Sequence, residues 1–180
     1  MNLIVNAGSE TVKFDLFRGD KKLLSFVYHK KSEAEYLSSL KNLSRNPKLV
    51  QYFQAGIIKK IGFRVVHGGG VFEKPVLVTK AVLQRLKRLD DLAPLHNPYA
   101  RQLIERACVL FPKLPKILVF DTAFHATLPE ENRIYALPSR LTKKYALRRF
   151  GFHGIVCSSL VAQLKRLKKL KSRLIICFLI

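Results

Sequence analysis

The order of its strand-like and helix-like segments constrains the fold of this chain more than any other feature. Three short segments that are apolar, or that alternate between apolar and polar residues, come first with brief turns between them, which predicts an antiparallel meander. Helical segments follow, and strands then alternate with helices as in parallel sheets. The predicted strands are residues 3–5, 12–17, 23–28, 61–66 and 117–121, and the first predicted helices are residues 32–43 and 49–58. We therefore expect an α/β fold with a mixed sheet.

Two further helices are predicted between the last two strands. Apolar residues recur on one face over residues 82–92, as in an amphipathic helix. Pro98 suits the first turn of the next helix, with Asn97 as its N-cap, and apolar residues continue at helical spacing to Phe111. Each of the later strands thus follows helical segments, which is the pattern of parallel strands joined by crossovers.

The last part of the sequence combines a basic helix with a short apolar run. Its leucines and valine face one way between Leu160 and Leu170, which fits either a core-facing helix with a solvated basic face or an interfacial helix. Leu174 to Ile180 has the composition of a buried strand, which needs neighbours that no later residue supplies. We therefore expect the front part of an enzyme whose remainder is absent, with an apolar end that promotes self-association.

The formal net charge of +21 allows an anionic partner such as nucleic acid, a membrane surface or a phosphorylated ligand. The charges are spread along the chain, apart from one dense cluster over residues 165–173, and no DNA- or RNA-binding signature accompanies them. We therefore expect neither nucleic acid nor a membrane as the main partner.

Cysteine usage and the N-terminus predict a cytoplasmic protein. Cys108, Cys157 and Cys177 are widely spaced and form neither a Cys-x-x-Cys pair nor a zinc pattern, which is typical of reduced core residues. The first residues lack a basic n-region, and their apolar run is too short for a signal peptide.

Two turns next to strands carry groups that suit anions. Asn6 to Thr11 combines a glycine with two hydroxyl side chains, which can cradle a phosphate or hold a magnesium-bound water, or can simply form a polar hairpin turn. Arg64 to Gly69 places an arginine near the end of a strand, where a guanidinium group can bind a carboxylate or phosphate in bidentate fashion. The alternative is a surface arginine above a glycine turn.

Three further motifs place polar groups at element ends. His96 lies at a helix entrance, where it can donate to an anion or merely fill space. Asp121 follows a parallel-type strand, where α/β sheets place ligands, although the same position suits a helix cap. Arg148 to Gly154 is a glycine-flanked histidine turn beside two arginines, which is typical of phosphate handling.

These five motifs, in this order, closely resemble those of acetate kinases from Met1 to about Gly154. They are Asn-Ala-Gly-Ser, Arg-Val-Val-His-Gly-Gly, Ala-Pro-Leu-His-Asn-Pro, Phe-Asp-Thr-Ala-Phe-His and Arg-Arg-Phe-Gly-Phe-His-Gly. The resemblance implies the two-lobed actin/hexokinase/Hsp70-like fold, with a ribonuclease-H-like lobe over residues 1–123 and the incomplete start of a second, nucleotide-binding lobe over residues 124–180. It implies transfer of a phosphoryl group from ATP to acetate with Mg²⁺ or Mn²⁺, in a homodimer.

The resemblance also implies a role for each matched residue. Asn6 would hold magnesium, and Ser9, Thr11 and Lys13 would contact ATP. Arg64 would bind the acetate carboxylate, while Asp121, His153 and His96 would serve the phosphoryl transfer. The pocket for the acetate methyl group would consist of Val66, Leu95 and Phe152. Phosphoryl transfer depends on positioning and on positive charge around the phosphate oxygens, which such a set supplies.

The chain also departs from the family pattern. The first turn contains Glu10 between Ser9 and Thr11, and Gly154 is followed by Ile-Val-Cys rather than by Thr-Ser-His. The chain ends where the family's His-Leu-Gly-Asn-Gly phosphate loop would begin. We therefore expect this chain to be inactive alone. A truncated gene, an incomplete gene model and a split protein whose other half is a separate chain all fit the sequence. The alternatives are a propionate or butyrate kinase relative and a non-catalytic basic binding remnant.

Overall fold

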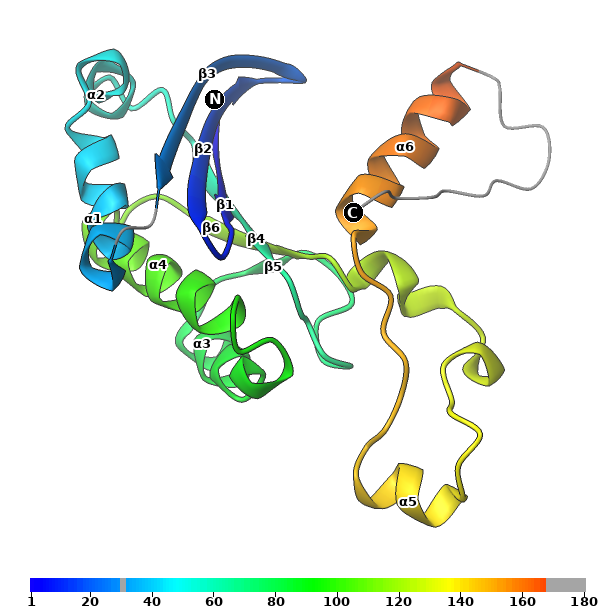
Figure 1. Ribbon diagram of the computed structural model, residues 1–180. Coiled ribbons are helices and arrows are strands. Elements are labelled where there is room, and N and C mark those ends of the chain that lie inside the picture. The colour runs from blue at the N-terminus through cyan, green and yellow to red at the C-terminus, as the bar shows by residue number, and fades with distance from the viewer. Residues whose placement is uncertain (30–31, 168–180) are drawn as a thin grey trace.

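The computed structural model describes residues 1–29 and 32–167 and contains, in this part of the chain, one mixed six-stranded sheet with the order β3-β2-β1-β4-β6-β5 (Figure 1). The strands are β1 (Asn2–Ala7), β2 (Thr11–Arg18), β3 (Lys21–His29), β4 (Lys60–Val65), β5 (Val76–Leu77) and β6 (Lys116–Phe120). The first three form the predicted antiparallel meander, and β4 and β6 run parallel to β1. The predicted α/β fold with a mixed sheet is thus confirmed.

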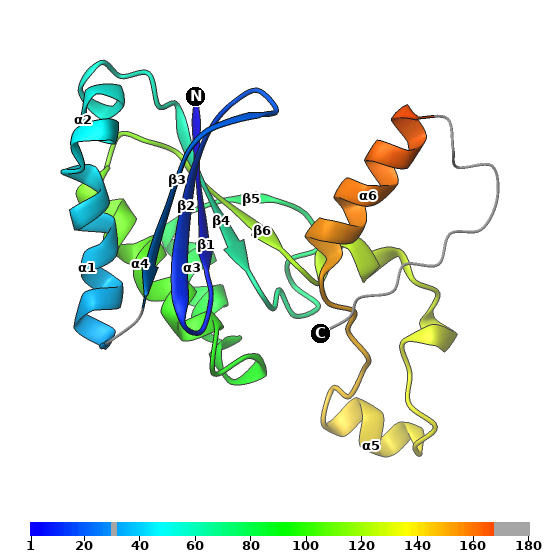
Figure 2. The ribbon, with the colours of Figure 1, turned by 45° about the horizontal axis from the view of Figure 1, so that its top comes forward.

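The helices cover the two sides of this sheet unequally. They are α1 (Glu33–Ser44), α2 (Pro47–Gln54), α3 (Lys80–Lys87), α4 (Asn97–Leu110), α5 (Ser139–Lys144) and α6 (Gly154–Arg166), with short 3₁₀ turns at Asp90–Leu92, Ala123–Thr127 and Glu130–Asn132. Figure 2 shows α1 to α4 on one side of the sheet and α6 on the other. A groove of about 570 Å³, lined by Ile4 and Phe17 among others, separates α6 from the sheet.

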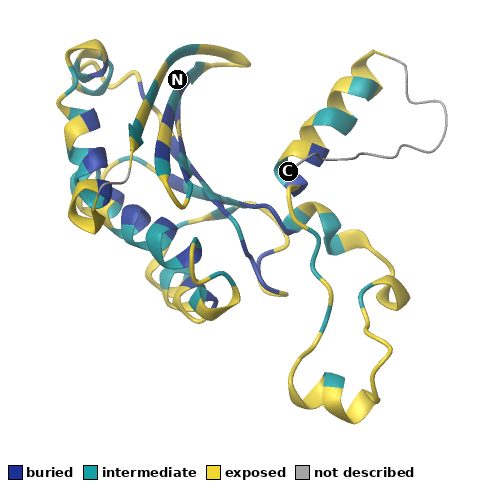
Figure 3. Cartoon of the chain, viewed as in Figure 1, coloured by how far each residue is buried: buried dark blue, intermediate teal, exposed yellow. Residues whose placement is uncertain are grey.

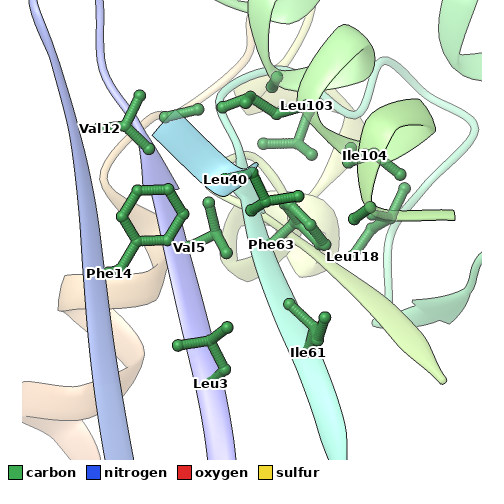
Figure 4. Packing of buried hydrophobic residues seen from close by; sticks show 14 of the residues in the cluster. Leu3, Val5, Val12, Phe14, Leu40, Ile61, Phe63, Leu103, Ile104 and Leu118 are labelled. Carbon is green, nitrogen blue, oxygen red and sulfur yellow. The ribbon is translucent and has the colours of Figure 1, made fainter. Parts of the chain in front are cut away.

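The core lies between the sheet and the first four helices. In β1 and β4 every second residue is buried, and these residues point toward α1 and α4 (Figure 4). Leu3, Val5 and Phe63 are at most 1% exposed and pack in one cluster with Leu40 and Leu103. Burying such a side chain fully contributes about 1.5–3 kcal/mol. The alternate residues, which include Asn6 and Arg64, lie on the opposite face of the sheet.

The segment between β6 and α6 is much more exposed than the rest (Figure 3). It carries several large apolar side chains at the surface, namely Leu128, Ile134, Tyr135, Leu137, Leu141, Tyr145 and Leu147. An apolar surface of this density is typical of an interface rather than of a free surface. The predicted division into lobes at residue 123 stays a prediction.

Three details of the predicted elements were wrong. Asn97 is the first residue of α4 and not its N-cap, which is His96, and the His96 side chain makes no capping hydrogen bond. The helix predicted over residues 82–92 ends at Lys87 and gives way to a 3₁₀ turn. The helix predicted over residues 49–58 begins earlier, because Asn46 caps it and Pro47 occupies its first turn. The predicted strand at residues 174–180 lies outside the described residues.

Gly154 is a position where an added methyl group should damage the fold. A Cβ atom there would lie 2.2 Å from the Asp121 carbonyl oxygen and 2.7 Å from Phe124 Cβ. We expect Gly154→Ala to lower the free energy of unfolding by about 1–3 kcal/mol, the usual effect of overpacking. Gly62→Ala is the control, because its Cβ would meet the flexible end of Ile4 at 3.0 Å. Urea unfolding of both variants decides, and equal losses would contradict the prediction.

Candidate active site

Three side chains meet where β1, β4 and β6 reach their carboxyl ends. Arg64 Nε and Nη2 donate to Asp121 Oδ2 at 3.0 and 2.6 Å, and Arg64 Nη1 donates to Asn6 Oδ1 at 3.0 Å. Asn6 and Arg64 are register partners on adjacent parallel strands, and Asp121 directly follows β6. Parallel strands bring their carboxyl ends to one edge of a sheet, so residues 58 and 57 positions apart in the chain form one cluster.

The pairing makes Arg64 a fixed and partly open cation. The Asp121 side chain is 3% exposed, whereas that of Arg64 is 28% exposed. A buried carboxylate needs a partner, because removing its counter-charge leaves an uncompensated buried charge. The planar guanidinium group is therefore held in one orientation by three hydrogen bonds, in a side chain that stays partly exposed.

His96 stands at the start of α4 near this cluster. Burial and the positive charge of Arg64 lower the pKa of His96, while the charge of Asp121 acts in the opposite direction. Its imidazole is therefore neutral near pH 7 and can act as an uncharged donor or acceptor. Leu95, its neighbour, is 68% exposed.

A turn after β4 is tied to α4 by Asn97, for which the sequence predicted only the role of an N-cap. Asn97 is fully buried and makes hydrogen bonds to both the N–H and the C=O of His67. His67 is 4% exposed, and burial lowers its pKa. Its Nδ1 accepts from the Gly69 N–H at 2.9 Å, which fixes the neutral tautomer with the proton on Nε2. A histidine followed by three glycines was a signal for a tight turn but not for this burial.

The histidine loop at residues 148–154 lies against the same junction. The Phe152 ring meets the His67 ring edge-on at 5.4 Å. The Gly154 N–H donates to the Asp121 carbonyl oxygen at 2.8 Å, so the backbone next to His153 is tied to the residue that pairs with Arg64. His153 itself is in the left-handed region, with φ of 57°, and its side chain is exposed. The structure thus brings this loop to Asp121.

The predicted phosphate turn closes β1 onto β2. The Gly8 N–H donates to the Thr11 carbonyl oxygen at 2.8 Å, and the Tyr36 hydroxyl donates to the Gly8 carbonyl oxygen at 3.4 Å. Lys13 pairs with Asn6 in the register, so both side chains project from the same face of the sheet. Ser9 and Lys13 are exposed and Thr11 is partly exposed. Their contact with a nucleotide stays a prediction.

The three residues predicted to line the acid pocket are neighbours of the His67 turn or of the start of α4. Val66 is partly exposed and directly precedes His67, and Leu95 lies two residues before Asn97. Phe152 is 42% exposed and rests against the His67 ring. That these three side chains line one pocket stays a prediction.

Asn6 and Asp121 offer oxygen atoms that suit a magnesium ion whose remaining ligands are waters and substrate phosphates. Among the described residues, no group of three or more His, Cys, Asp and Glu side chains could hold a metal. Asp121 supplies one carboxylate and Asn6 one amide oxygen, and both already accept from Arg64. Mg²⁺ is commonly held by one or two carboxylates together with waters and substrate phosphates, so this donor set fits an ion that arrives with a nucleotide.

The two shielded histidines predict a loss of stability in acid. Their pKa values are lowered in the folded chain, so below the ordinary value of about 6.5 the unfolded chain binds protons more readily than the folded chain does. The contribution of these two histidines to the free energy of unfolding is then constant above about pH 7. It falls as the pH drops below 6.5 toward their lowered pKa values. We expect His67→Asn, which removes one titrating group, to flatten this slope. Thermal unfolding between pH 5 and 8 measures it, and equal slopes would contradict the prediction.

The mixed sheet, with Asn6, Arg64 and Asp121 joined at its carboxyl edge, defines an α/β protein whose polar cluster lies where such sheets place ligands. The model of the acetokinase family matches residues 25–179, and the chain belongs to this family. The acetate kinase of Helicobacter acinonychis is 39% identical over 179 residues, which cover 84% of this chain and 45% of the relative. That of Shewanella frigidimarina is 42% identical over 142 residues, covering 79% and 34%. The chain thus spans less than half the length of the curated relatives it matches.

Solved structures show the same fold. A propionate kinase from Francisella tularensis has a TM-score of 0.79 and 32% identity, covering 95% of this chain and 50% of its own. An acetate kinase from Porphyromonas gingivalis has a TM-score of 0.78 and 26% identity, covering 94% and 49%. Within the described residues, no helix is both long enough and apolar enough to cross a membrane.

Proposed function

We propose that this chain supplies the acid-binding side of a carboxylate kinase that makes acetyl phosphate from acetate and ATP. The observation that carries this proposal is Arg64, whose guanidinium group is held by Asn6 and the buried Asp121 and whose side chain stays 28% exposed. A fixed, partly open arginine beside a neutral histidine suits a small carboxylate. Membership of the acetokinase family supports the same reaction.

The proposed chemistry assigns one task to each group. Arg64 binds the acetate carboxylate and orients one oxygen toward the γ-phosphorus of ATP. A bond forms between that oxygen and phosphorus while the bond to the ADP oxygen breaks, so ADP leaves with the electron pair. His153 donates to the phosphoryl oxygens, and His96 supports it. Preorganised donors of this kind stabilise the charge of the transition state.

The nucleotide side is proposed more coarsely. Lys13, Ser9 and Thr11 would contact phosphates, and Asn6 and Asp121 would hold Mg²⁺, which neutralises the phosphate charge. The rest of the nucleotide site would come from sequence corresponding to the other half of the relatives, either as a second lobe beyond residue 124 or as a separate chain. We further propose a cytoplasmic homodimer.

Propionate is the second candidate acid. It is favoured by the resemblance of the fold to the Francisella tularensis propionate kinase. One methylene in an apolar pocket changes selectivity by about 1–3 kcal/mol, so Val66, Leu95 and Phe152 would decide between the two acids.

Titration of the 180-residue chain with carboxylates, followed by NMR at the His96 ring and the Arg64 Nε–H, tests the proposal. Acetate should shift both signals in a saturable way, and propionate should compete with it. Acetamide, which has the same shape without the charge, should not bind. A chain that is folded and shows no saturable shift with either acid would contradict the proposed function and favour a non-catalytic remnant.

A further inference from the structure

Asn97 is a buried polar residue to which the proposed reaction gives no task. Its side chain is 0% exposed and makes three hydrogen bonds. Oδ1 accepts from the His67 N–H at 3.2 Å, and Nδ2 donates to the carbonyl oxygens of His67 at 2.9 Å and of Leu89 at 3.0 Å. Both amide hydrogens of Asn97 are therefore used. The backbone N–H and C=O of His67 both bind the Asn97 side chain, as they would bind the backbone of a neighbouring strand.

The hydrogen bonds between Asn97 and His67 join two parts of the candidate site, the end of β4 and the start of α4. His67 lies at the end of the segment that carries Arg64 and Val66, while Asn97 follows His96 directly. β4 and α4 also pack against each other in the core, where Phe63 and Leu103 belong to one cluster. The Asn97 amide adds directional hydrogen bonds at the end of this contact that lies nearest the guanidinium and imidazole groups.

The turn at His67 also contacts a third part of the site, which consists of Thr122 and the histidine loop. Its Nδ1 accepts from the Gly69 N–H at 2.9 Å, and the Gly68 N–H donates to Thr122 Oγ1 at 3.0 Å. The ring also meets Phe150 edge-on, with centroids 4.5 Å apart. The turn is thus connected to α4, to the residue after Asp121 and to the histidine loop.

We propose that Asn97 is a positioning residue for the acid-binding site, which holds the end of β4 and the start of α4 at the spacing in which Arg64, Val66 and His96 face one ligand. The inference rests on the proposed function, because the ligand is the carboxylate assigned there. A purely structural role predicts something different: loss of Asn97 would lower stability without changing the affinity of the molecules that remain folded.

Asn97→Ala and a matched core variant, Leu103→Ala, separate the two roles in the 180-residue chain. Leu103 is 0% exposed and lies on the same helix, but it faces the core. At a temperature where both variants are folded, we expect Asn97→Ala to bind acetate at least about tenfold more weakly, the scale of one lost contact. Leu103→Ala should bind as the wild type does. Equal affinities of Asn97→Ala and the wild type would overturn the inference.

A measurement on the wild-type chain covers the case in which Asn97→Ala does not fold. Coupling between two sites is reciprocal, so saturating acetate should slow hydrogen exchange of the His67 N–H that Asn97 holds. The Leu40 N–H, in the core of α1, serves as the reference and should not respond. Unchanged exchange at His67 would overturn the inference.

Failure of the proposed function gives a different pattern. If the wild-type chain binds no carboxylate, the NMR signals of the His96 ring decide whether Asn97 positions it. Positioning predicts that these signals move in Asn97→Ala and stay in Leu103→Ala, and signals that stay in both variants would overturn the inference.

Discussion

Arg64→Ala is expected to weaken acetate binding about a hundredfold and to lower the free energy of unfolding by about 3 kcal/mol. The affinity falls because the ligand carboxylate loses its charge-assisted partner. The stability falls because Asp121 remains buried with its counter-charge removed. Acetate titration and urea unfolding of the 180-residue chain measure the two effects separately.

Arg101→Ala is the matched control for Arg64→Ala. Arg101 pairs with Asp90 through Nε at 3.0 Å and Nη2 at 2.9 Å, a similar geometry outside the candidate site. This variant should keep the wild-type affinity for acetate. The double variant Arg64→Ala/Asp121→Ala should regain part of the lost stability, since it removes the orphaned charge as well. Wild-type affinity in Arg64→Ala would contradict the assignment of Arg64.

Asp121→Asn is expected to lower turnover by about a hundredfold or more while changing the KM for acetate little. Asparagine keeps an oxygen that can accept from Arg64, and the hydrogen bond from the Gly154 N–H involves the backbone of Asp121, which the substitution leaves in place. What is lost is the negative charge proposed to hold Mg²⁺. The measurement is steady-state kinetics of a chimera in which this chain replaces the matching part of the Helicobacter acinonychis acetate kinase.

Asp90→Asn is the control in the same chimera, because Asp90 is also paired with an arginine but lies outside the site. It should leave kcat unchanged. If Asp121→Asn instead raised the acetate KM at unchanged kcat, the Asp121 carboxylate would serve acid binding. That result would contradict its proposed role in the phosphoryl step.

The strands were predictable from two apolar patterns. In the run from Val12 to Phe17 apolar residues stand at every second position, and the structure buries these residues in β2. Residues 3–5 and 117–120 are short continuous apolar runs, which are typical of buried strands, and the structure buries every second residue of β1 and β6. Short turns then left an antiparallel meander as the simplest arrangement of the first three strands.

The elements that sequence reasoning missed are short or depend on distant partners. β5 contains two residues and exists because Val76 and Leu77 pair with β6. α5 has six residues, too few for a helical period to be recognised. Asn97 looked like an N-cap, because its type and the following proline suit one, yet its partners are His67 and Leu89.

The candidate site was predictable residue by residue but not as a network. Arg64 and Asp121 each stood out at a strand end, and parallel strands bring such ends together. Their direct pairing, and the share of Asn6 in it, required the strand register. The role of His67 was hidden, because its burial depends on Asn97 and on aromatic rings that lie far along the chain.

Trapping of acetyl phosphate with hydroxylamine, in the chimera supplied with ATP, Mg²⁺ and acetate, tests the central claim most directly. We expect acetyl hydroxamate with the wild-type sequence, about a hundredfold less with Arg64→Ala, and undiminished product with Arg101→Ala. The 180-residue chain alone should give no product above a blank. A folded chimera that makes no acetyl hydroxamate, or one whose activity survives Arg64→Ala, would contradict the claim that this chain carries the acid-binding side of a carboxylate kinase.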